Sequence, residues 1–141
     1  MTKIVVEVGD APELDSLLAE RIYEFNAAAT GCRDAELFRI VRKSESGELE
    51  AGLSGYTWAR CCFVSYLWVS EPLRGKGLGT ALLSAAEEHA AGKGCLLVLL
   101  SSHSFQAPEF YARRGYQQVA RIEDHPVGHA SFFFSKRLDD R

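Results

Sequence analysis

The residues of this sequence best suited to do chemistry stand in one short run around three glycines. Gly75, Gly77 and Gly79 occupy alternate positions between an apolar segment that ends near Val69 and a segment with helical spacing. Glycine lets the backbone approach a ligand closely, and the first turn of a helix offers unpaired N–H groups and the positive end of its dipole. A strand, a glycine turn and a helix in this order predict a site for an anion such as a pyrophosphate.

Two common phosphate-binding loops do not fit this run. A dinucleotide fingerprint needs its third glycine where Thr80 stands, and a Walker loop needs Ser or Thr after its lysine, whereas Gly77 follows Lys76. The remaining pattern, Arg74-x-x-Gly77-x-Gly79, resembles the acyl-CoA-binding signature Arg/Gln-x-x-Gly-x-Gly/Ala of the GNAT superfamily of acetyl-CoA-dependent N-acetyltransferases. The alternative interpretation is a glycine turn that only starts a helix.

A second motif lies at the expected distance beyond the glycines. The segment 110–116, Phe-Tyr-Ala-Arg-Arg-Gly-Tyr, resembles the family's Phe-Tyr-x-x-x-Gly-Phe/Tyr motif at the end of a helix. On both motifs together, the chain is identified as a member of the GNAT superfamily. The resemblance covers nearly the whole chain and implies a single N-acetyltransferase domain over residues 1–141.

The resemblance implies the fold and the cofactor. The fold class is α/β, with a central mixed, mostly antiparallel sheet of about seven strands that contains a splayed parallel pair and is flanked by helices. The cosubstrate is acetyl-CoA, with other acyl-CoAs left open. The residues implied in binding it are Trp68, Val69, Arg74, Gly75, Lys76, Gly77, Leu78, Gly79 and Thr80.

Acetyl transfer to an amine needs a proton for the departing thiolate and a neutral amine. Tyr111 matches the family's motif tyrosine, whose phenol would protonate the CoA sulfur; the alternative is a tyrosine that only packs on a helix face. A lysine-like amine costs about 4–5 kcal/mol to present in neutral form at pH 7, and an α-amine about 1 kcal/mol. The candidates for the base that removes this proton are water or one of four side chains, Glu71, His103, Glu123 and His125.

The acceptor predicted by the resemblance is a primary amine of a small molecule or a peptide. A non-catalytic sensor that binds acyl-CoA and an enzyme that acetylates a protein partner are the alternatives, because a fold does not fix a function. A sensor is expected to have lost the motif tyrosine, which this chain keeps as Tyr111. No particular acceptor follows from the sequence.

Composition limits the remaining classes of function. Lys and Arg number 16 and Asp and Glu number 19, a net charge of -3 that argues against nucleic acid as a partner. Four unevenly spaced cysteines fit neither a disulfide scaffold nor a zinc site, and Pro126 and Gly128 argue against a helical metal pair of His125 and His129. We expect no metal, no membrane span, a cytoplasmic protein and buried thiols.

Hydrophobic spacing predicts the elements. A first strand is expected over Lys3–Val8, a helix from Pro12 to about Phe25, and a small-residue loop over 26–34. The further elements expected are strands over 36–43, 48–58, 61–69, 95–100, 116–122 and 130–137, and helices over 77–91 and from near Pro108 to 114. The strand over 61–69 is expected to be covered on both faces. Phe132, Phe133 and Phe134 offer apolar side chains on both faces of a terminal strand, and together with the resemblance they predict a homodimer.

Overall fold

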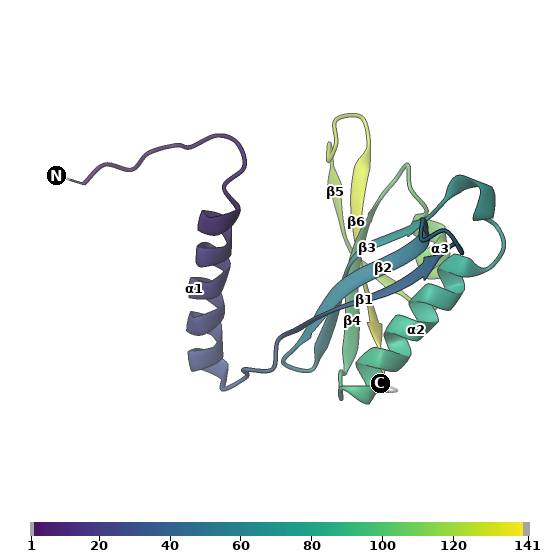
Figure 1. Cartoon of the computed structure of the whole chain (residues 1–141), viewed down its shortest axis with the longest axis horizontal. Coiled ribbons are helices and arrows are strands. Elements are labelled where there is room, and N and C mark those ends of the chain that lie inside the picture. The colour runs from purple at the N-terminus through teal and green to yellow at the C-terminus, as the bar shows by residue number, and fades with distance from the viewer. Residues whose placement is uncertain (1, 140–141) are drawn as a thin grey trace. The chain divides into compact units, whose positions relative to one another are not determined.

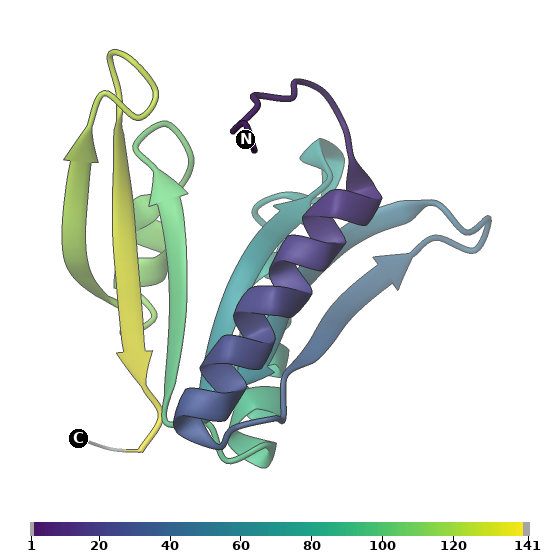
Figure 2. The same ribbon diagram turned by 90° about the vertical axis from the view of Figure 1, so that its left-hand side faces the viewer.

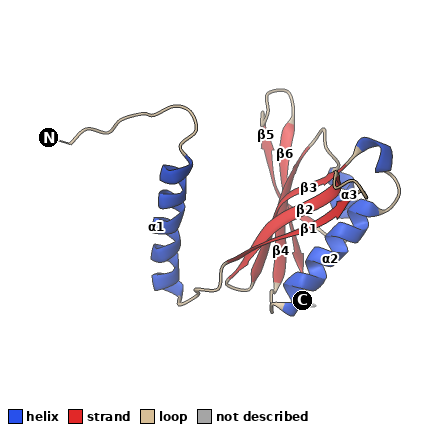
Figure 3. Cartoon of the chain, viewed as in Figure 1, coloured by secondary structure: helices blue, strands red, loops and turns tan. Residues whose placement is uncertain are grey.

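The computed structural model describes residues 2–139 and contains two compact units, Met1–Arg33 and Asp34–Arg141 (Figures 1 and 3). The first unit is one helix with the segment before it. The second unit is a six-stranded mixed sheet with its helices. Within the described residues, no helix is long and apolar enough to cross a membrane.

Helix α1, Pro12–Thr30, is longer than the sequence predicted. Pro12 occupies its first turn, where the missing N–H costs nothing, and Gly31 ends it with φ 78° and an N–H bond to Ala27 O of 2.7 Å. The loop expected from residue 26 is therefore wrong for residues 26–30. The three alanines of this stretch are the strongest helix formers, and small side chains do not by themselves end a helix.

The strand expected over Lys3–Val8 is absent from the structure. Residues 2–8 have no regular secondary structure, and none of the described strands pairs with them. β-branched residues favour an extended backbone, but a strand exists only where a neighbour completes its hydrogen bonds. The sheet consequently has six strands and not the expected seven or so.

The sheet has the strand order β1-β2-β3-β4-β6-β5. All neighbours are antiparallel except β3 and β4, which are parallel because helix α2 crosses between them. The strands are β1 Glu36–Lys43, β2 Leu49–Trp58, β3 Cys61–Val69, β4 Leu97–His103, β5 Gln117–Glu123 and β6 Ala130–Arg137. Every strand predicted from residue 36 onward is confirmed, with small changes at its ends.

The parallel pair separates soon after it forms. Strands β3 and β4 are paired at three positions, from Cys61 opposite Leu97 to Phe63 opposite Leu99, although β3 continues to Val69 and β4 to His103. Figure 2 shows the teal β3 and the green β4 close together at one end and well apart at the other. The splayed parallel pair expected from the resemblance is confirmed.

Helix α2, Leu78–Gly92, covers one face of the sheet and contacts β1, β2 and β3. The core is formed by alternate residues of the strands against the inner face of this helix, and it includes Leu53, Val64, Leu82, Leu83, Ala86, Ala90, Val98, Leu100, Phe132 and Phe134. Along β3, however, Tyr66 is 78% and Trp68 46% exposed. The expectation that β3 is covered on both faces is therefore wrong, because its residues alternate between the core and the opposite face.

Two local features of the sheet bear on the sequence predictions. The register shifts between Ser54 and Gly55, and a Cβ at Gly55 would lie 2.3 Å from Phe63 O, so a bulge lies at this glycine. Strand β6 lies between β4 and β5 and not at an edge. Phe132 and Phe134 are buried and Phe133 is half-buried, so this strand offers less free apolar surface than expected.

Candidate active site

A cavity of about 930 Å³ opens where β3 and β4 separate. It is bounded by the end of β3, the glycine turn with the start of α2, the end of β4 and the short helix α3, Pro108–Ala112. The sequence-predicted residues in its lining are Trp68, Val69, Arg74, Gly75, Gly77, Leu78, Gly79, Thr80 and Tyr111. Lys76 is exposed and does not line the cavity.

Gly77 sets the geometry at the start of helix α2. A short 3₁₀ helix, Glu71–Leu73, precedes the turn, and Gly77 is the N-cap residue with φ 86°. A side chain at this φ is strained, and a Cβ there would meet no atom within 4 Å. No side chain caps the helix, so the first N–H groups of α2 remain available at the cavity wall. This arrangement suits an anion.

Gly79 is required for a different reason. A Cβ at this position would lie 3.3 Å from Cζ of Phe110 and 3.4 Å from its Cε1. The glycine therefore allows the first turn of α2 to pack against the Phe110 ring of α3. The sequence suggested a close approach to a ligand at this position, and the structure shows a close approach to an aromatic ring.

Arg74 folds back on the strand that precedes the turn. Its Nε donates a hydrogen bond of 2.9 Å to the backbone O of Val69. Among residues 2–139 no hydrogen bond of its two terminal nitrogens is found. The guanidinium thus fixes the turn through Nε and keeps its two terminal nitrogens for an anionic group.

Arg114 is a cavity residue that the sequence did not single out. Its Nε donates to Thr80 Oγ1 at 3.0 Å and its Nη1 to Phe110 O at 2.8 Å, while its guanidinium lies 3.8 Å from the Phe110 ring centroid. These contacts join α2 to α3 beside the glycine turn. In the sequence Arg114 is one of the variable positions of the second motif, and nothing local predicts its contact with Thr80, 34 residues earlier.

Two tyrosines of the second motif have different surroundings. The hydroxyl of Tyr116 donates to Glu87 Oε2 at 2.8 Å, and Lys136 Nζ binds the other oxygen of Glu87 at 2.9 Å. The Tyr111 hydroxyl has no hydrogen-bond partner among the described residues, and Tyr111 lines the cavity. Burial raises the pKa of Tyr111 above its ordinary value, so its phenol stays protonated at neutral pH.

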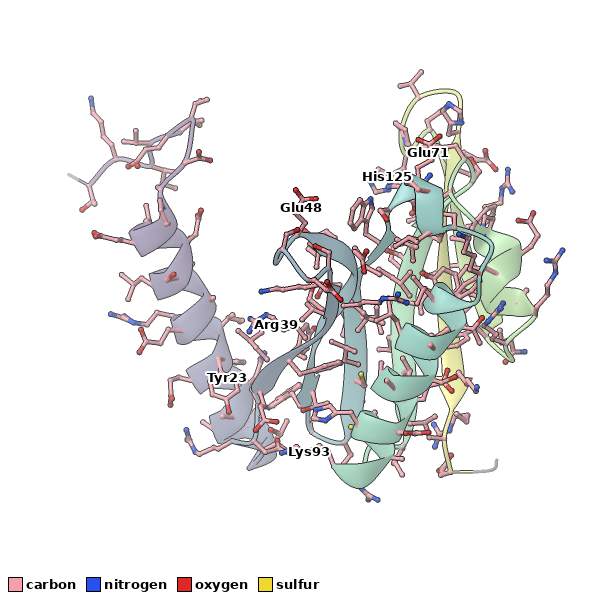
Figure 4. The ribbon with its side chains drawn as sticks, turned by 45° about the vertical axis from the view of Figure 1, so that its right-hand side comes forward. Tyr23, Arg39, Glu48, Glu71, Lys93 and His125 are labelled. Carbon is pink, nitrogen blue, oxygen red and sulfur yellow. The ribbon has the colours of Figure 1, made fainter. Side chains whose placement is uncertain are left out.

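The four candidate bases lie at the same end of the sheet but differ in their contacts. Figure 4 shows Glu71 and His125 at this end and Lys93 at the other. Glu123 is exposed and paired with Arg121, a hydrogen bond that lowers the pKa of Glu123. His103, at the end of β4, has Nδ1 3.0 Å from the backbone O of His125.

Thiols do not supply a nucleophile in this cavity. None of the four cysteines lines it. Cys62 is fully buried, and burial raises the pKa of its thiol to about 12, so its reactive thiolate is scarcely populated at neutral pH. Among the described residues, no group of three His, Cys, Asp or Glu side chains could hold a metal ion.

Known proteins resemble this chain over most of its length. The family model described as acetyltransferase (GNAT) family matches residues 7–116. A blasticidin-S acetyltransferase of Streptomyces morookaense is 38% identical over 107 residues, 75% of this chain and 79% of that protein. An acetyltransferase of Agrobacterium fabrum is 26% identical over 98% of this chain and 100% of its own.

A solved structure agrees with both the fold and the assignment. The crystal structure of an acetyltransferase from Bacillus cereus ATCC 14579 is 36% identical, covers 96% of this chain and 98% of its own, and superposes with a TM-score of 0.81. The matched residues 7–116 include the glycine turn and both tyrosines of the second motif. The chain therefore belongs to the GNAT family and is an acetyltransferase.

Proposed function

We propose that this acetyltransferase transfers the acetyl group of acetyl-CoA to a primary amine of a small molecule or a peptide. The observation that carries the proposal is that one cavity contains both an uncapped helix start behind a glycine turn and the unpaired phenol of Tyr111. The relative that acts on blasticidin S supports a small-molecule acceptor. The match of residues 7–116 to one family model supports a single catalytic domain over 1–141.

The phosphate end of acetyl-CoA fits the glycine turn. The free N–H groups of Leu78, Gly79 and Thr80 at the start of α2, together with the two free nitrogens of Arg74, would hold the pyrophosphate. The cavity volume of about 930 Å³ lies within the usual range for small-molecule sites. Gly75 and Gly77 shape the turn by their positive φ, and Lys76, outside the lining, would add only charge nearby.

The thioester end fits the splayed strands. Beyond Phe63 and Leu99, β3 has no strand partner on its β4 side, so backbone groups near Trp68 and Val69 lack sheet partners there. These groups would bind the pantetheine arm and a carbonyl that becomes more negative during transfer, an interaction that typically contributes a few kcal/mol.

Tyr111 would be the general acid. Bound acetyl-CoA supplies the thioester whose acetyl group is transferred. Burial raises the pKa of Tyr111, so the phenol keeps its proton at neutral pH. It would give this proton to the CoA thiolate as the thiolate departs. The unpaired hydroxyl also distinguishes this chain from the non-catalytic sensor, for which a free phenol in the cavity has no use.

We further propose a cytoplasmic enzyme that forms a homodimer. Cys61, Cys62 and Cys95 are free thiols, which suits a reducing compartment. Exposed apolar side chains in each unit support a second copy as partner. An enzyme that acetylates a protein partner stays the alternative for the acceptor.

Isothermal calorimetry with acetyl-CoA tests the cofactor site. We expect micromolar affinity for the wild type and at least a hundredfold loss in Gly77→Asp, which places a negative charge at the free amides. Gly47→Asp is the matched control, because Gly47 has φ 89° and the same open surroundings but lies in the β1–β2 hairpin. Equal affinity in the wild type and Gly77→Asp would contradict the cofactor site.

A panel of amines tests the acceptor. Thiol release from acetyl-CoA and the mass of the product would be measured for small amines, peptides and intact proteins. We expect turnover with at least one small amine or peptide. Binding of acetyl-CoA without turnover of any acceptor would favour the sensor, and turnover only with intact proteins would favour the protein-acetylating alternative.

A further inference from the structure

We propose that His103 is the general base that accepts the proton of the acceptor amine through its Nε2 atom. The proposal rests on the function proposed above and identifies a residue for the step that the family resemblance leaves open. It is carried by the hydrogen bond that fixes the imidazole tautomer, by the position of His103 on β4, and by the contacts of the other candidates.

The backbone O of His125 determines which nitrogen of His103 carries the hydrogen. His103 Nδ1 lies 3.0 Å from this oxygen. A carbonyl oxygen only accepts hydrogen bonds, so Nδ1 must be the donor, and in the neutral imidazole Nε2 then has the free electron pair. His103 is thereby prepared to accept a proton at one defined atom.

His103 does not itself line the cavity but lies beside residues that do. Ser101 and His103 lie on the same face of β4, two residues apart, and Ser101 lines the cavity. The His103 ring stacks on Phe105, another lining residue, with centroids 5.3 Å apart and planes 7° apart. The backbone N–H of His103 also donates to Oε1 of the lining residue Gln106 at 2.6 Å. The ring is thus held at the border of the site.

The other candidates are less suited to take a proton. Glu123 is occupied by Arg121, which lowers its pKa. His125 is exposed, lies with its ring edge-on to that of His103 at 5.2 Å, and contributes its backbone oxygen as the orienting group. Glu71 lies exposed on the 3₁₀ helix, and no hydrogen bond or ion pair among the described residues orients its carboxylate.

The titratable side chains around the His103 ring come mainly from the β5–β6 loop. The ring of His125 faces it directly, and His129 lies beyond Phe105, with its ring 5.0 Å from that of Phe105. The charged residues next to His125 in the sequence are Asp124 of the same loop and the Arg121–Glu123 pair of β5. From β6, the residue opposite His103 is the uncharged Ser131.

The proposed step balances with Tyr111 as the acid. The amine nitrogen forms a bond to the acetyl carbon, and the bond between that carbon and sulfur breaks. Nε2 of His103 takes the proton that the nitrogen loses, and the departing sulfur takes the proton of the Tyr111 hydroxyl. Solvent then removes the proton from His103 and returns one to Tyr111, so the enzyme is unchanged.

The pH dependence of the variant His103→Gln tests the kinetic role. Its amide still donates to the His125 carbonyl but has no basic atom. For an amine of high pKa, log kcat/KM of the wild type should rise with slope 2 in the acid range and with slope 1 at higher pH, because the amine and the base must both lose a proton. His103→Gln should show slope 1 throughout, kcat/KM lower by about 10²–10⁴, and unchanged acetyl-CoA affinity. His125→Gln, which keeps the backbone oxygen, should retain the change of slope.

A measurement without turnover tests the tautomer. Nitrogen-15 NMR of the histidine side chains at pH 8 should show one imidazole protonated at Nδ1 whose signals disappear in His103→Gln. A proton on Nε2 of His103, or a change of slope that persists in His103→Gln and vanishes in His125→Gln, would overturn the proposal. Failure of the wild type to bind acetyl-CoA would overturn the proposed function itself, so the two failures are distinguishable.

Discussion

Tyr111 and Tyr116 stand five residues apart in one motif, yet their hydroxyl groups have opposite surroundings. Tyr116 donates to Glu87, and Lys136 completes that network. The Tyr111 ring packs among Phe110, Tyr116 and Phe134, whereas its hydroxyl has no partner among the described residues and belongs to the cavity wall. A packed ring whose hydroxyl is left for the cavity suits a proton donor.

The variant Tyr111→Phe separates these two roles. It keeps the ring and removes the proton donor, so we expect kcat to fall by about 10²–10⁴ with acetyl-CoA affinity and melting temperature nearly unchanged. In the wild type, burial raises the pKa of Tyr111, so its phenol loses the proton only above the ordinary tyrosine pKa of about 10. We therefore expect kcat to show no alkaline decline below this pH. Steady-state kinetics, calorimetry and thermal unfolding provide the three measurements.

Tyr116→Phe is the matched control, because it removes the same atom from a paired tyrosine. It should lower the free energy of unfolding by about 1 kcal/mol and leave kcat close to that of the wild type. Normal kcat in Tyr111→Phe, with acetyl transfer shown to limit the rate, would end the assignment of Tyr111 as the acid.

Nine of the twenty residues that line the cavity were predicted from the sequence, but their contacts were not. The glycines, Arg74 and Tyr111 were predicted from motif spacing, and all of them line the cavity. Arg114 and Phe105 were not predicted as site residues, since their place depends on elements that meet only after folding. The tautomer of His103 likewise depends on an oxygen 22 residues away.

At the scale of elements, the glycine motif joins two helices. Helix α2 begins at the glycine turn, and α3 presents Phe110 to Gly79 and the Phe110 carbonyl oxygen to Arg114. The five-residue helix α3 is too short to be stable alone, so its position depends on these contacts. Packing at Gly79 thus positions Tyr111, the next residue after Phe110.

A double-mutant cycle measures this packing. In Gly79→Ala the new Cβ would lie 3.3 Å from Phe110, so the gain in helix propensity of up to about 1 kcal/mol is opposed by crowding. In a Phe110→Leu background the crowding is relieved. Denaturant unfolding should therefore show a favourable coupling of about 1 kcal/mol between the two changes.

Gly92→Ala serves as the control for the cycle. Gly92 ends α2, and a Cβ there would meet no atom within 4 Å. Its effect on the free energy of unfolding should add to that of Phe110→Leu. Additive effects for Gly79→Ala as well would show that the glycine is not required for packing on Phe110.

Elements were predictable where local pattern and tertiary partner agree. The strands from β1 to β6 have alternating or continuous apolar runs bounded by glycines or turns, and each has a neighbour. Lys3–Val8 has the composition of a strand but no partner among the described strands. For residues 26–30, small side chains were mistaken for a loop signal, although alanine favours helix.

At the scale of the whole molecule, large apolar side chains are exposed in both units. In the first unit Val5, Leu18 and Phe25 are 69%, 62% and 71% exposed, and in the second Leu37 and Tyr66 are 76% and 78% exposed. A single helix offers no second layer that could bury its own apolar side chains. Each unit taken by itself thus presents an apolar surface of the kind that marks a site of association.

Charge makes a second copy a suitable partner for these surfaces. Helix α1 carries four acidic side chains and one basic side chain. On β1, the exposed Leu37 shares one face of the strand with the basic residues Arg39 and Lys43. The exposed apolar side chains of α1 are thus accompanied by acidic residues, and those of β1 by basic residues. In a pair of copies, α1 of each copy could contact β1 of the other, which would give two symmetric contacts. The segment Phe132–Phe134 contributes less to such a pair than the sequence suggested, because Phe132 and Phe134 are core residues.

Light scattering tests the homodimer. At tens of micromolar protein we expect twice the chain mass of 15.6 kDa, because the exposed apolar surface is removed from water in the pair. Leu37→Glu should shift the mass toward the monomer by placing a charge in that surface. Val127→Glu is the control, because Val127 is 85% exposed but lies alone on the β5–β6 loop, and this variant should keep the dimer mass. A monomer mass for the wild type at this concentration would contradict the dimer, and equal dissociation by both variants would contradict the assignment of β1 to its interface.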